Sequence, residues 1–402
     1  MASSVVYLDY NATTPVADEV FEAMVPYLRQ SYGNASSSHT LGLDAKRAVD
    51  QARAQIATML QADSPSEILF LSGGTESINY AIKGSAAVEK HGRDRNHIIT
   101  SCVEHVAVLE TCRYLEGKGY EVTYVPVDEH GRVNVEDVIQ AVKPSTFFIS
   151  VMLANNEVGT VQPIAEITQR VKDIVASHPD EYSRVLFHTD ASQAIGKIPV
   201  SVHDLGVDFL TIAGHKLYAP KGIGALYMRS SAPIPETLVH GASHEHGRRA
   251  GTENVPYIAG LGKACELVTQ NISTYKTEMA TRKSALFREI QAQLAGAGVE
   301  LRVNGHPEHV LPNTLSLSYK DISAIQLLQM IEGQSVYASA GSACHSHHGE
   351  EEVKPSAVLT AMKVPIEFAL GTLRLSVGRE TSDSDIKHAA TVIAQSVRDL
   401  AG

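Results

Sequence analysis

The sequence predicts an α/β fold, in which a mostly parallel sheet is covered by helices on both faces and a smaller α/β domain follows. Three observations lead to this prediction. Short runs of β-forming residues alternate with amphipathic helical runs from Glu67 onward. Polar residues gather directly after the apolar runs, and open α/β sheets bind ligands at the carboxyl ends of their strands. The chain of 402 residues is also longer than one average domain.

Seven apolar runs are predicted to form the strands of the main sheet, with helical patterns between most of them. In chain order they are Ile68–Leu71, His97–Thr100, Val122–Val125, Phe147–Met152, Val185–His188, Phe209–Ala213 and Ala225–Met228. A strand-like run, Val5–Leu8, follows the first four residues, so no signal or transit peptide is expected.

The composition is that of an ordinary globular protein, with 44% hydrophobic and 20% charged residues. The net charge of −11 comes without a basic cluster longer than two residues, which argues against nucleic acid or an anionic membrane as a partner. No apolar tract approaches the roughly 18 residues of a membrane-spanning helix. The four cysteines show neither a disulfide framework nor the paired spacing of a zinc site. We therefore expect no metal and a reducing, cytoplasmic location.

Lys216 stands between two apolar strands, Phe209–Ala213 and Ala225–Met228. An ammonium group is costly to bury, and burial lowers its pKa. A lysine whose pKa is lowered can form a Schiff base. On this stretch alone, Lys216 is either such a nucleophile or a solvated lysine in a turn.

Other strand ends carry residues that allow two interpretations each. Gly74 and Thr75 open a helix, either as a phosphate cradle or as an ordinary capped helix start. His105 could stack on a planar ligand or be a satisfied histidine at a helix start. Asp190 is either a helix cap or the counter-ion of a ligand cation, and Asn156 belongs either to a group of amide donors or to a turn.

Taken together, these strand ends describe one kind of site. A phosphate cradle, a ring that stacks, a strand-end acid and a strand-end lysine are the set that pyridoxal phosphate (PLP) requires. We therefore expect a PLP site at the carboxyl edge of the sheet.

A loop and a long helical tract follow the sheet. Residues 239–254 are rich in glycine, histidine and arginine, and are interpreted either as a functional loop or as a solvated connection. The helical tract is predicted from Pro256 to about Leu294, with a break after Val268.

The second domain contains two candidate functional residues. Cys344 lies among small residues and histidines, which suggests a reactive thiol on an exposed loop, the alternative being a Cys/His metal site. Arg374 lies in a strand-like run, where it could hold a substrate carboxylate or form a structural ion pair.

These motifs together resemble the cysteine desulfurase and selenocysteine lyase family, within the class V branch of the fold-type-I PLP enzymes. The resemblance runs essentially from end to end and is nearest in appearance to the selenocysteine lyases. Its motifs are DYNATTP at Asp9–Pro15, SGGTES at Ser72–Ser77, VEH at Val103–His105, ANNEVG at Ala154–Gly159, HTDASQ at His188–Gln193, GHK at Gly214–Lys216, RAGTEN at Arg249–Asn254, GSACHS at Gly341–Ser346 and RLSVGR at Arg374–Arg379.

The resemblance implies a function and three segments. The function is removal of selenium or sulfur from L-selenocysteine or L-cysteine, giving L-alanine, with Cys344 as the acceptor of the chalcogen atom. Residues 1–15 would form an N-terminal segment at the active site, residues 16–260 the large PLP-binding domain, and residues 261–402 a small domain that carries Cys344. A homodimer and a protein acceptor of sulfur or selenium are the partners that the resemblance allows.

The resemblance also implies a role for each site residue. Lys216 would bind the cofactor covalently and move the Cα proton, with His105 stacked on the ring as a further acid or base. The remaining cofactor contacts would come from Asp190, Gln193, Gly74, Thr75, His215 and, from a partner subunit, Thr252. Asn11, Asn156 and Arg374 would hold the substrate.

The sequence departs from the family pattern in places and leaves alternatives open. Ala213 stands where desulfurases often have a serine ligand for phosphate, and the 241–245 loop reads GASHE. A related aminotransferase or C–S lyase would not need Cys344. A non-catalytic sulfur or metal-handling module would carry no chromophore on Lys216.

Overall fold

The computed structural model describes residues 5–90, 95–340 and 354–402. Its main sheet has seven strands in the order β2-β8-β7-β6-β5-β3-β4. Their bounds are β2 Ile68–Leu71, β3 His97–Ser101, β4 Glu121–Val125, β5 Thr146–Ser150, β6 Leu186–Asp190, β7 Phe209–Ala213 and β8 Gly224–Met228. Strand β8 runs antiparallel to both of its neighbours, whereas the other pairs are parallel. The predicted seven-stranded, mostly parallel sheet is confirmed.

The strands are buried on both faces, which explains their continuous apolar sequence. In β2, Leu69 and Leu71 pack into the core that contains α3 and α4. Ile68 and Phe70, which point to the other face, pack into the core that contains α2, α6 and the first part of α8. The bounds of the helices in this part of the chain are α1 Asp18–Arg29, α2 Thr40–Leu60, α3 Gly74–Lys90, α4 Val106–Glu116, α5 Val135–Ala141, α6 Ile164–Ser177 and α7 Val202–Leu205, with short 3-10 turns η1 Pro65–Glu67, η2 Gly214–Lys216 and η3 Glu245–Gly247.

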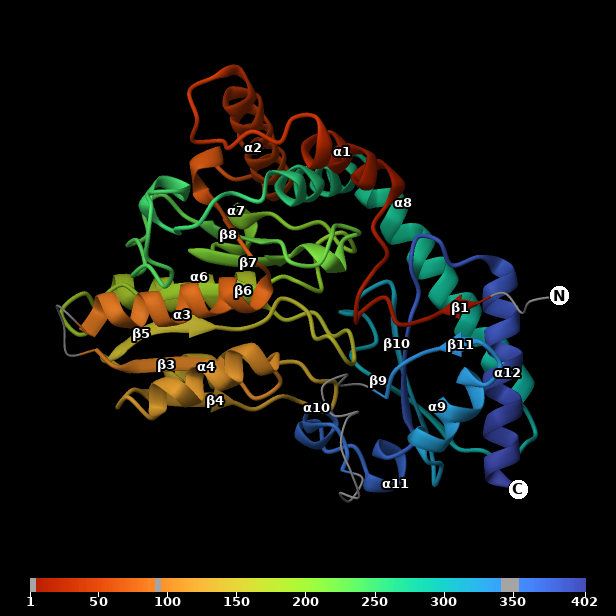
Figure 1. Ribbon diagram of the computed structural model, residues 1–402. Helices are drawn as coiled ribbons and strands as arrows, with labels where there is room; N and C mark the ends of the chain where they lie inside the picture. The colour runs from red at the N-terminus through yellow and green to blue at the C-terminus, as the bar shows by residue number, and fades with distance from the viewer. Residues whose placement is uncertain (1–4, 91–94, 341–353) are drawn as a thin grey trace.

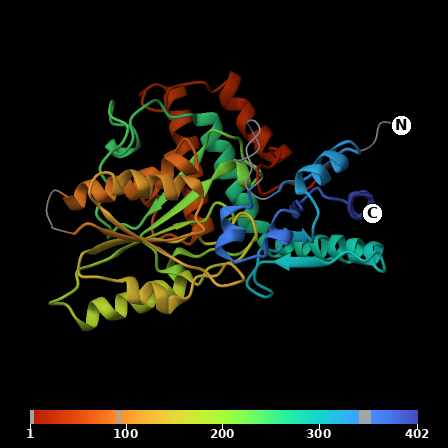
Figure 2. The same cartoon turned by 90° about the horizontal axis from the view of Figure 1, so that it is seen from below.

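A second, smaller sheet lies to one side of the main sheet, along the second half of the long helix α8 (Figure 1). It has the antiparallel order β12-β10-β9 and packs against α9, α12 and the second part of α8. A two-stranded parallel sheet joins β1 to β11, so the N-terminal segment from Val6 packs with this smaller unit, and the C-terminus of the chain lies on the same side (Figure 2). The bounds are β1 Val6–Tyr7, β9 Leu301–Asn304, β10 Thr314–Tyr319, β11 Val336–Tyr337, β12 Thr372–Ser376, α8 Val255–Leu294, α9 Ala324–Glu332, α10 Ala357–Ala361, α11 Ile366–Ala369 and α12 Asp383–Ala401.

Helix α8 is continuous over 40 residues, so the break predicted after Val268 is wrong. The polar stretch 269–278 suggested that break, and none of its residues is buried. Residues up to Val268 pack into the core of the main sheet, and residues from Met279 onward pack into the core of the smaller sheet. A polar helical stretch is stable where it bridges two packed units. We propose that the chain divides into units at this stretch of α8, near the boundary expected at residue 260.

Within residues 5–90, 95–340 and 354–402, no helix combines the length and the apolar character that crossing a bilayer requires.

His188, on β6, should make stability depend on pH. Its ring nitrogens lie 2.8 Å from Ser150 Oγ and 2.9 Å from Thr211 Oγ1, and burial lowers the pKa of the ring from 6.5 to about 4. Between these two values the unfolded chain binds the extra proton, so the free energy of unfolding should fall as the pH drops from 6.5 to 4. The shift corresponds to about 3 kcal/mol.

Urea unfolding between pH 4 and pH 7 measures this dependence. In His188→Gln the slope over this range should be smaller than in the wild type. The same substitution at the exposed His178 is the matched control, and an unchanged slope in His188→Gln would show that His188 does not contribute.

Candidate active site

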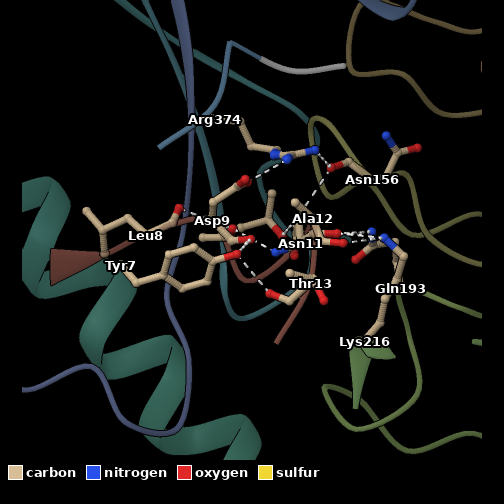
Figure 3. Close-up of polar contacts among 12 residues, drawn as sticks. Tyr7, Leu8, Asp9, Asn11, Ala12, Thr13, Asn156, Gln193, Lys216 and Arg374 are labelled. Atoms are coloured by element: carbon tan, nitrogen blue, oxygen red, sulfur yellow. Dashed lines mark hydrogen bonds and ion pairs between the residues drawn. The ribbon is translucent and has the colours of Figure 1, made fainter. Parts of the chain in front are cut away.

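Lys216 ends the 3-10 turn η2, directly after β7. Its Nζ donates a hydrogen bond to the carbonyl oxygen of Asn11 at 2.7 Å and lies 3.4 Å from that of Ala12. Figure 3 shows the amine directed at this turn of the N-terminal segment. The lysine is partly buried, as expected for a residue at the end of a buried strand.

Asn11 fastens the N-terminal segment to the smaller sheet. Its Nδ2 donates to Thr314 Oγ1 at 2.8 Å, and Thr314 Oγ1 donates to Asn313 Oδ1 at 3.0 Å. Asn313 Nδ2 in turn donates to Asn11 Oδ1 at 3.0 Å, which closes a ring of three hydrogen bonds. Asn11 is almost fully buried, so this ring holds the turn that faces Lys216 in one geometry.

The end of β6 supplies an acid and an amide to the same place. Asp190 is the last residue of the strand, is buried, and accepts a hydrogen bond from the backbone N–H of Ser192 at 2.9 Å. Gln193 Nε2 donates to the Asn11 carbonyl oxygen at 2.9 Å, so Gln193 and Lys216 share one acceptor. The turn after β6 therefore lies against the turn that receives the lysine.

His105 caps the N-terminus of α4, and its Nδ1 accepts from the backbone N–H of Ala107 at 3.2 Å. Burial lowers the pKa of the ring, Asp190 opposes this shift, and Lys216 adds to it. His105, Asp190 and Lys216 thus lie within electrostatic range of one another. The helix-capping interpretation of His105 is correct, and it is compatible with a functional role for the exposed part of the ring.

His215 precedes Lys216, and its Nδ1 lies 3.1 Å from Thr13 Oγ1. Burial and the charge of Lys216 lower the pKa of the imidazole to about 4. The neutral ring can bind an anionic ligand only as a hydrogen-bond donor, through a ring N–H.

Helix α3 begins at Gly74, so Gly74 and Thr75 form its first turn. Its first turn leaves backbone N–H groups, those of Gly74 and Thr75 among them, without an intrahelical acceptor. A Cβ on Gly74 would lie 3.3 Å from Ala213 Cβ and 3.4 Å from Ser192 Oγ. The helix start therefore sits against the ends of β6 and β7, beside the other site residues, where it can bind an anion.

Arg374, on β12, is buried, and its side chain contacts Asp9 and Asn156 (Figure 3). Its Nη2 lies 2.7 Å from Asp9 Oδ1, and its Nη1 donates to the carbonyl oxygen of Asn156 at 3.0 Å. Its Nε is buried and has no hydrogen-bond partner. The ion-pair interpretation is therefore correct, and Nε remains as a donor for a carboxylate.

A buried ion pair holds the loop that departs from the family pattern. Glu245 accepts from Arg53 Nη2 at 2.6 Å and from Arg53 Nη1 at 2.9 Å, and it also accepts from the backbone N–H of Phe70. Further along, Arg249 Nε donates to Glu76 Oε1 at 3.0 Å, which links this loop to the first turn of α3. Thr252 itself is exposed.

Cys344 lies outside the described residues, but both flanks of its segment are placed. Before it, Ser339 pairs with Arg374 through backbone hydrogen bonds of 3.3 Å and 2.6 Å. After it, Ser356 Oγ donates to the carboxylate of Glu157, which follows Asn156. The chain thus leaves and re-enters the described structure next to two of the expected substrate-binding residues.

Sequence reasoning assigned no role to two residues of this site. Asp9 was read only as part of a motif, and it is the partner of Arg374. Lys197 was not considered, and its buried Nζ contacts both Asn11 and Gln193. The signal for Lys197 was present, because a lysine in the apolar run Ala194–Val200 is as unusual as one at a strand end.

Comparison with known proteins identifies the class. The family profile described as "Aminotransferase class-V" matches residues 6–388. Among solved structures, a "NifS-like protein" superposes with a TM-score of 0.86 at 38% identity, covering 98% of this chain and 99% of that one. A structure described as "SspA in complex with cysteine" gives a TM-score of 0.77 at 34% identity, covering 94% and 100%. The chain therefore belongs to the class V aminotransferase family, whose members depend on PLP.

Curated relatives narrow this assignment. "Cysteine desulfurase IscS" of Methanosarcina thermophila is 44% identical over 98% of this chain and 92% of the relative. The protein of the same name from Dictyoglomus turgidum is 43% identical over 98% and 95%. A "Cysteine desulfurase" of Trichormus azollae is 43% identical over 99% and 94%. Within its family, the chain thus belongs with the cysteine desulfurases, and the narrower likeness to selenocysteine lyases stays a prediction.

The residues brought together here suit PLP. A partly buried lysine amine donates to a backbone carbonyl oxygen, a buried carboxylate lies at the end of the neighbouring strand, and a helix N-terminus opens beside both. These are the amine, the acid and the phosphate site that the cofactor needs.

Proposed function

We propose that this enzyme removes the sulfur of L-cysteine, releases L-alanine and receives the sulfur on Cys344 as a persulfide. One observation carries the proposal: the turn at Asn11 and Ala12 receives the amine of Lys216, while Gln193 and Arg374 reach the same segment from β6 and β12. Residues far apart in the chain thus converge where a PLP-bound amino acid would react.

The cofactor contacts follow from the positions of the side chains. Lys216 would hold PLP covalently, Asp190 would pair with its ring nitrogen, and Gln193 would donate to its ring hydroxyl group. His105 would stack on the ring. The phosphate would be bound by the start of α3 at Gly74 and Thr75, and by His215. When bound, PLP supplies an electron sink for the carbanion that forms at the substrate Cα.

The chain's own groups would carry the remaining work. Arg374, with its free Nε, would bind the substrate carboxylate beside Asn156, while Asn11 would keep the turn in place. Lys216 Nζ would take the Cα proton and return a proton to the product. The Cys344 thiolate would attack the substrate sulfur, so that an S–S bond forms and the substrate C–S bond breaks. The electron pair of that bond goes to the substrate carbon, which gains a proton to become the methyl group of alanine.

The flanks of the Cys344 segment support this role. Ser339 is bonded to the backbone of Arg374, and Ser356 to the carboxylate of Glu157. The described chain on the two sides of Cys344 is thus tied to Arg374 and to the neighbour of Asn156, the two residues proposed to hold the substrate.

Measurement of L-alanine formation tests the proposed function. Purified, PLP-loaded enzyme with L-cysteine should release alanine, and Cys344→Ser should lower persulfide formation roughly tenfold or more. Cys102→Ser is the matched control, since Cys102 is a free, partly buried thiol. L-selenocysteine in parallel measures the preference for the chalcogen atom. Alanine formation that is unaffected in Cys344→Ser would favour another C–S lyase, and no alanine from either substrate would overturn the proposal.

A homodimer completes the proposed site. Helix α1 exposes Phe21 and Leu28, each 52% exposed, and Tyr32 beyond it is 71% exposed. Ser36 Oγ lies 3.3 Å from His244 Nδ1, so this apolar surface adjoins the loop that carries the exposed Thr252. Pairing of two copies would cover the apolar side chains and bring Thr252 to the phosphate of the partner subunit. We further propose a cytoplasmic location and a protein acceptor for the sulfur.

A further inference from the structure

Lys197 is a second lysine in the proposed site, and the mechanism above does not use it. It lies in the turns that follow β6 and is only 4% exposed. Its Nζ donates to Asn11 Oδ1 at 3.0 Å and to Gln193 Oε1 at 2.6 Å. A buried lysine is costly to the fold, so its retention beside the lysine that binds the cofactor calls for a function.

Lys197 determines which way the Gln193 amide faces. Lys197 Nζ donates a hydrogen bond to the amide, so the amide atom that it contacts is the oxygen, which is the acceptor. The Nε2 of Gln193 is then directed to the carbonyl oxygen of Asn11 at 2.9 Å, and one N–H remains for a ligand. Without Lys197 the amide could rotate, and an oxygen would face the ring hydroxyl group instead of a donor.

Lys197 also fixes the acceptor of Lys216. It shares Asn11 Oδ1 with Asn313 Nδ2, and the backbone oxygen of Asn11 receives Lys216 Nζ. The two lysines are therefore bonded to opposite ends of one buried residue. Protonation of one amine disfavours protonation of the other.

The charged groups around Lys197 act in the same direction. Lys216 on the turn after β7 and Arg374 on β12 both lie within electrostatic range of Lys197, as does His215. Burial, followed by the charges of Lys216 and Arg374, places the pKa of Lys197 well below its ordinary value.

We propose that Lys197 is a positioning residue for the cofactor: it orients the Gln193 amide toward the ring hydroxyl group and weakens proton binding at the Lys216 nitrogen. This inference rests on the proposed function, because it requires PLP on Lys216. Loss of Lys197 removes a neighbouring amine and a hydrogen bond to the ring oxygen, and both changes strengthen proton binding at the Lys216 nitrogen. Lys197 thereby keeps the Lys216 nitrogen unprotonated in a fraction of the enzyme molecules near neutral pH.

The test is a pH titration of the visible absorption band of the purified, PLP-loaded enzyme, in the oligomeric state in which it is isolated. In Lys197→Met the midpoint should move to higher pH by about one unit or more. Lys197→Arg, which keeps a cationic donor, should stay nearer to the wild-type midpoint. Lys283→Met is the matched control, because Lys283 is also a desolvated lysine but bonds to Leu311 O, away from Asn11 and Gln193.

The outcomes separate this inference from the proposed function. A midpoint in Lys197→Met that equals that of the wild type, with full cofactor content, would overturn the inference, whatever happens to stability. If Lys197→Met does not fold, Lys197→Gln is titrated in its place, and an unchanged midpoint again overturns it. A wild type without a visible band would instead overturn the proposed function itself.

Discussion

Lys216→Ala is expected to lose covalent attachment of PLP and to lower kcat for L-cysteine by on the order of 10⁴-fold. The amine of Lys216 is directed at the Asn11 and Ala12 carbonyl oxygens, and the turn that it faces is held by the hydrogen bonds among Asn11, Thr314 and Asn313. Alanine should therefore remove the nucleophile and the proton carrier while leaving the turn intact. Borohydride reduction followed by peptide mass spectrometry measures the attachment directly.

The control for this variant is Lys387→Ala, which removes an exposed lysine on α12. Lys387→Ala should keep reduced PLP on Lys216 and should keep the wild-type activity. Label on Lys197 in place of Lys216 would contradict the assignment and exchange the roles of the two lysines. Alanine at position 216 has no amine and cannot hold PLP. The position of any reduced PLP in the variant therefore tests the assignment directly.

The strands of the main sheet could be predicted because their signal is local. β2, β7 and β8 are apolar runs bounded by glycine or polar residues, and their predicted bounds agree with the structure to within one residue. Their order in the sheet was not predicted, since pairing depends on contacts between distant segments. The antiparallel direction of β8 likewise follows from the turn of residues 214–223, which no local periodicity reveals.

The continuity of α8 shows where a local rule fails. A polar stretch inside a helical pattern suggested a break, but the helix continues where it passes between two cores. Hydrophobic periodicity in a sequence reveals a helix that buries one face along its whole length. Where α8 passes from one core to the other, it buries no face, so the periodicity is lost although the helix continues.

The same distinction applies to the site. Lys216, Asp190 and His105 could be found because each stands at a strand end, where the sheet alone brings them together. The contacts of Asn11 could not be found in this way, because its partners are distant in the chain. Lys197 is 186 positions away from Asn11, and Asn313 is 302 positions away. Asp9 was missed for the same reason, since its partner Arg374 is 365 residues distant. The identity of such partners depends on the packing of the two units against each other.

Arg374→Lys is expected to raise KM for L-cysteine by about 100-fold while kcat changes little. The Arg374 guanidinium is a planar fork of donors, and its buried Nε has no hydrogen-bond partner within the described chain. Lysine keeps the positive charge beside Asp9 and so limits the cost of leaving that carboxylate unpaired. It cannot reproduce the hydrogen bond that Nε would donate to the carboxylate, and a hydrogen bond to a charged group contributes roughly 1.5–3 kcal/mol.

Substrates with and without a carboxylate distinguish this role from a structural one. The wild type should prefer L-cysteine strongly over cysteamine, which lacks the carboxylate, whereas Arg374→Lys should show a much smaller preference. Asp9→Asn is the companion variant: it frees Nη2 of Arg374 from its ion pair and should not abolish the preference. An equal preference in wild type and Arg374→Lys would mean that the arginine serves only to pair with Asp9. In that case the carboxylate would have to be bound elsewhere, and Asn156, whose carbonyl oxygen already accepts from Arg374 Nη1, would be the next side chain to replace.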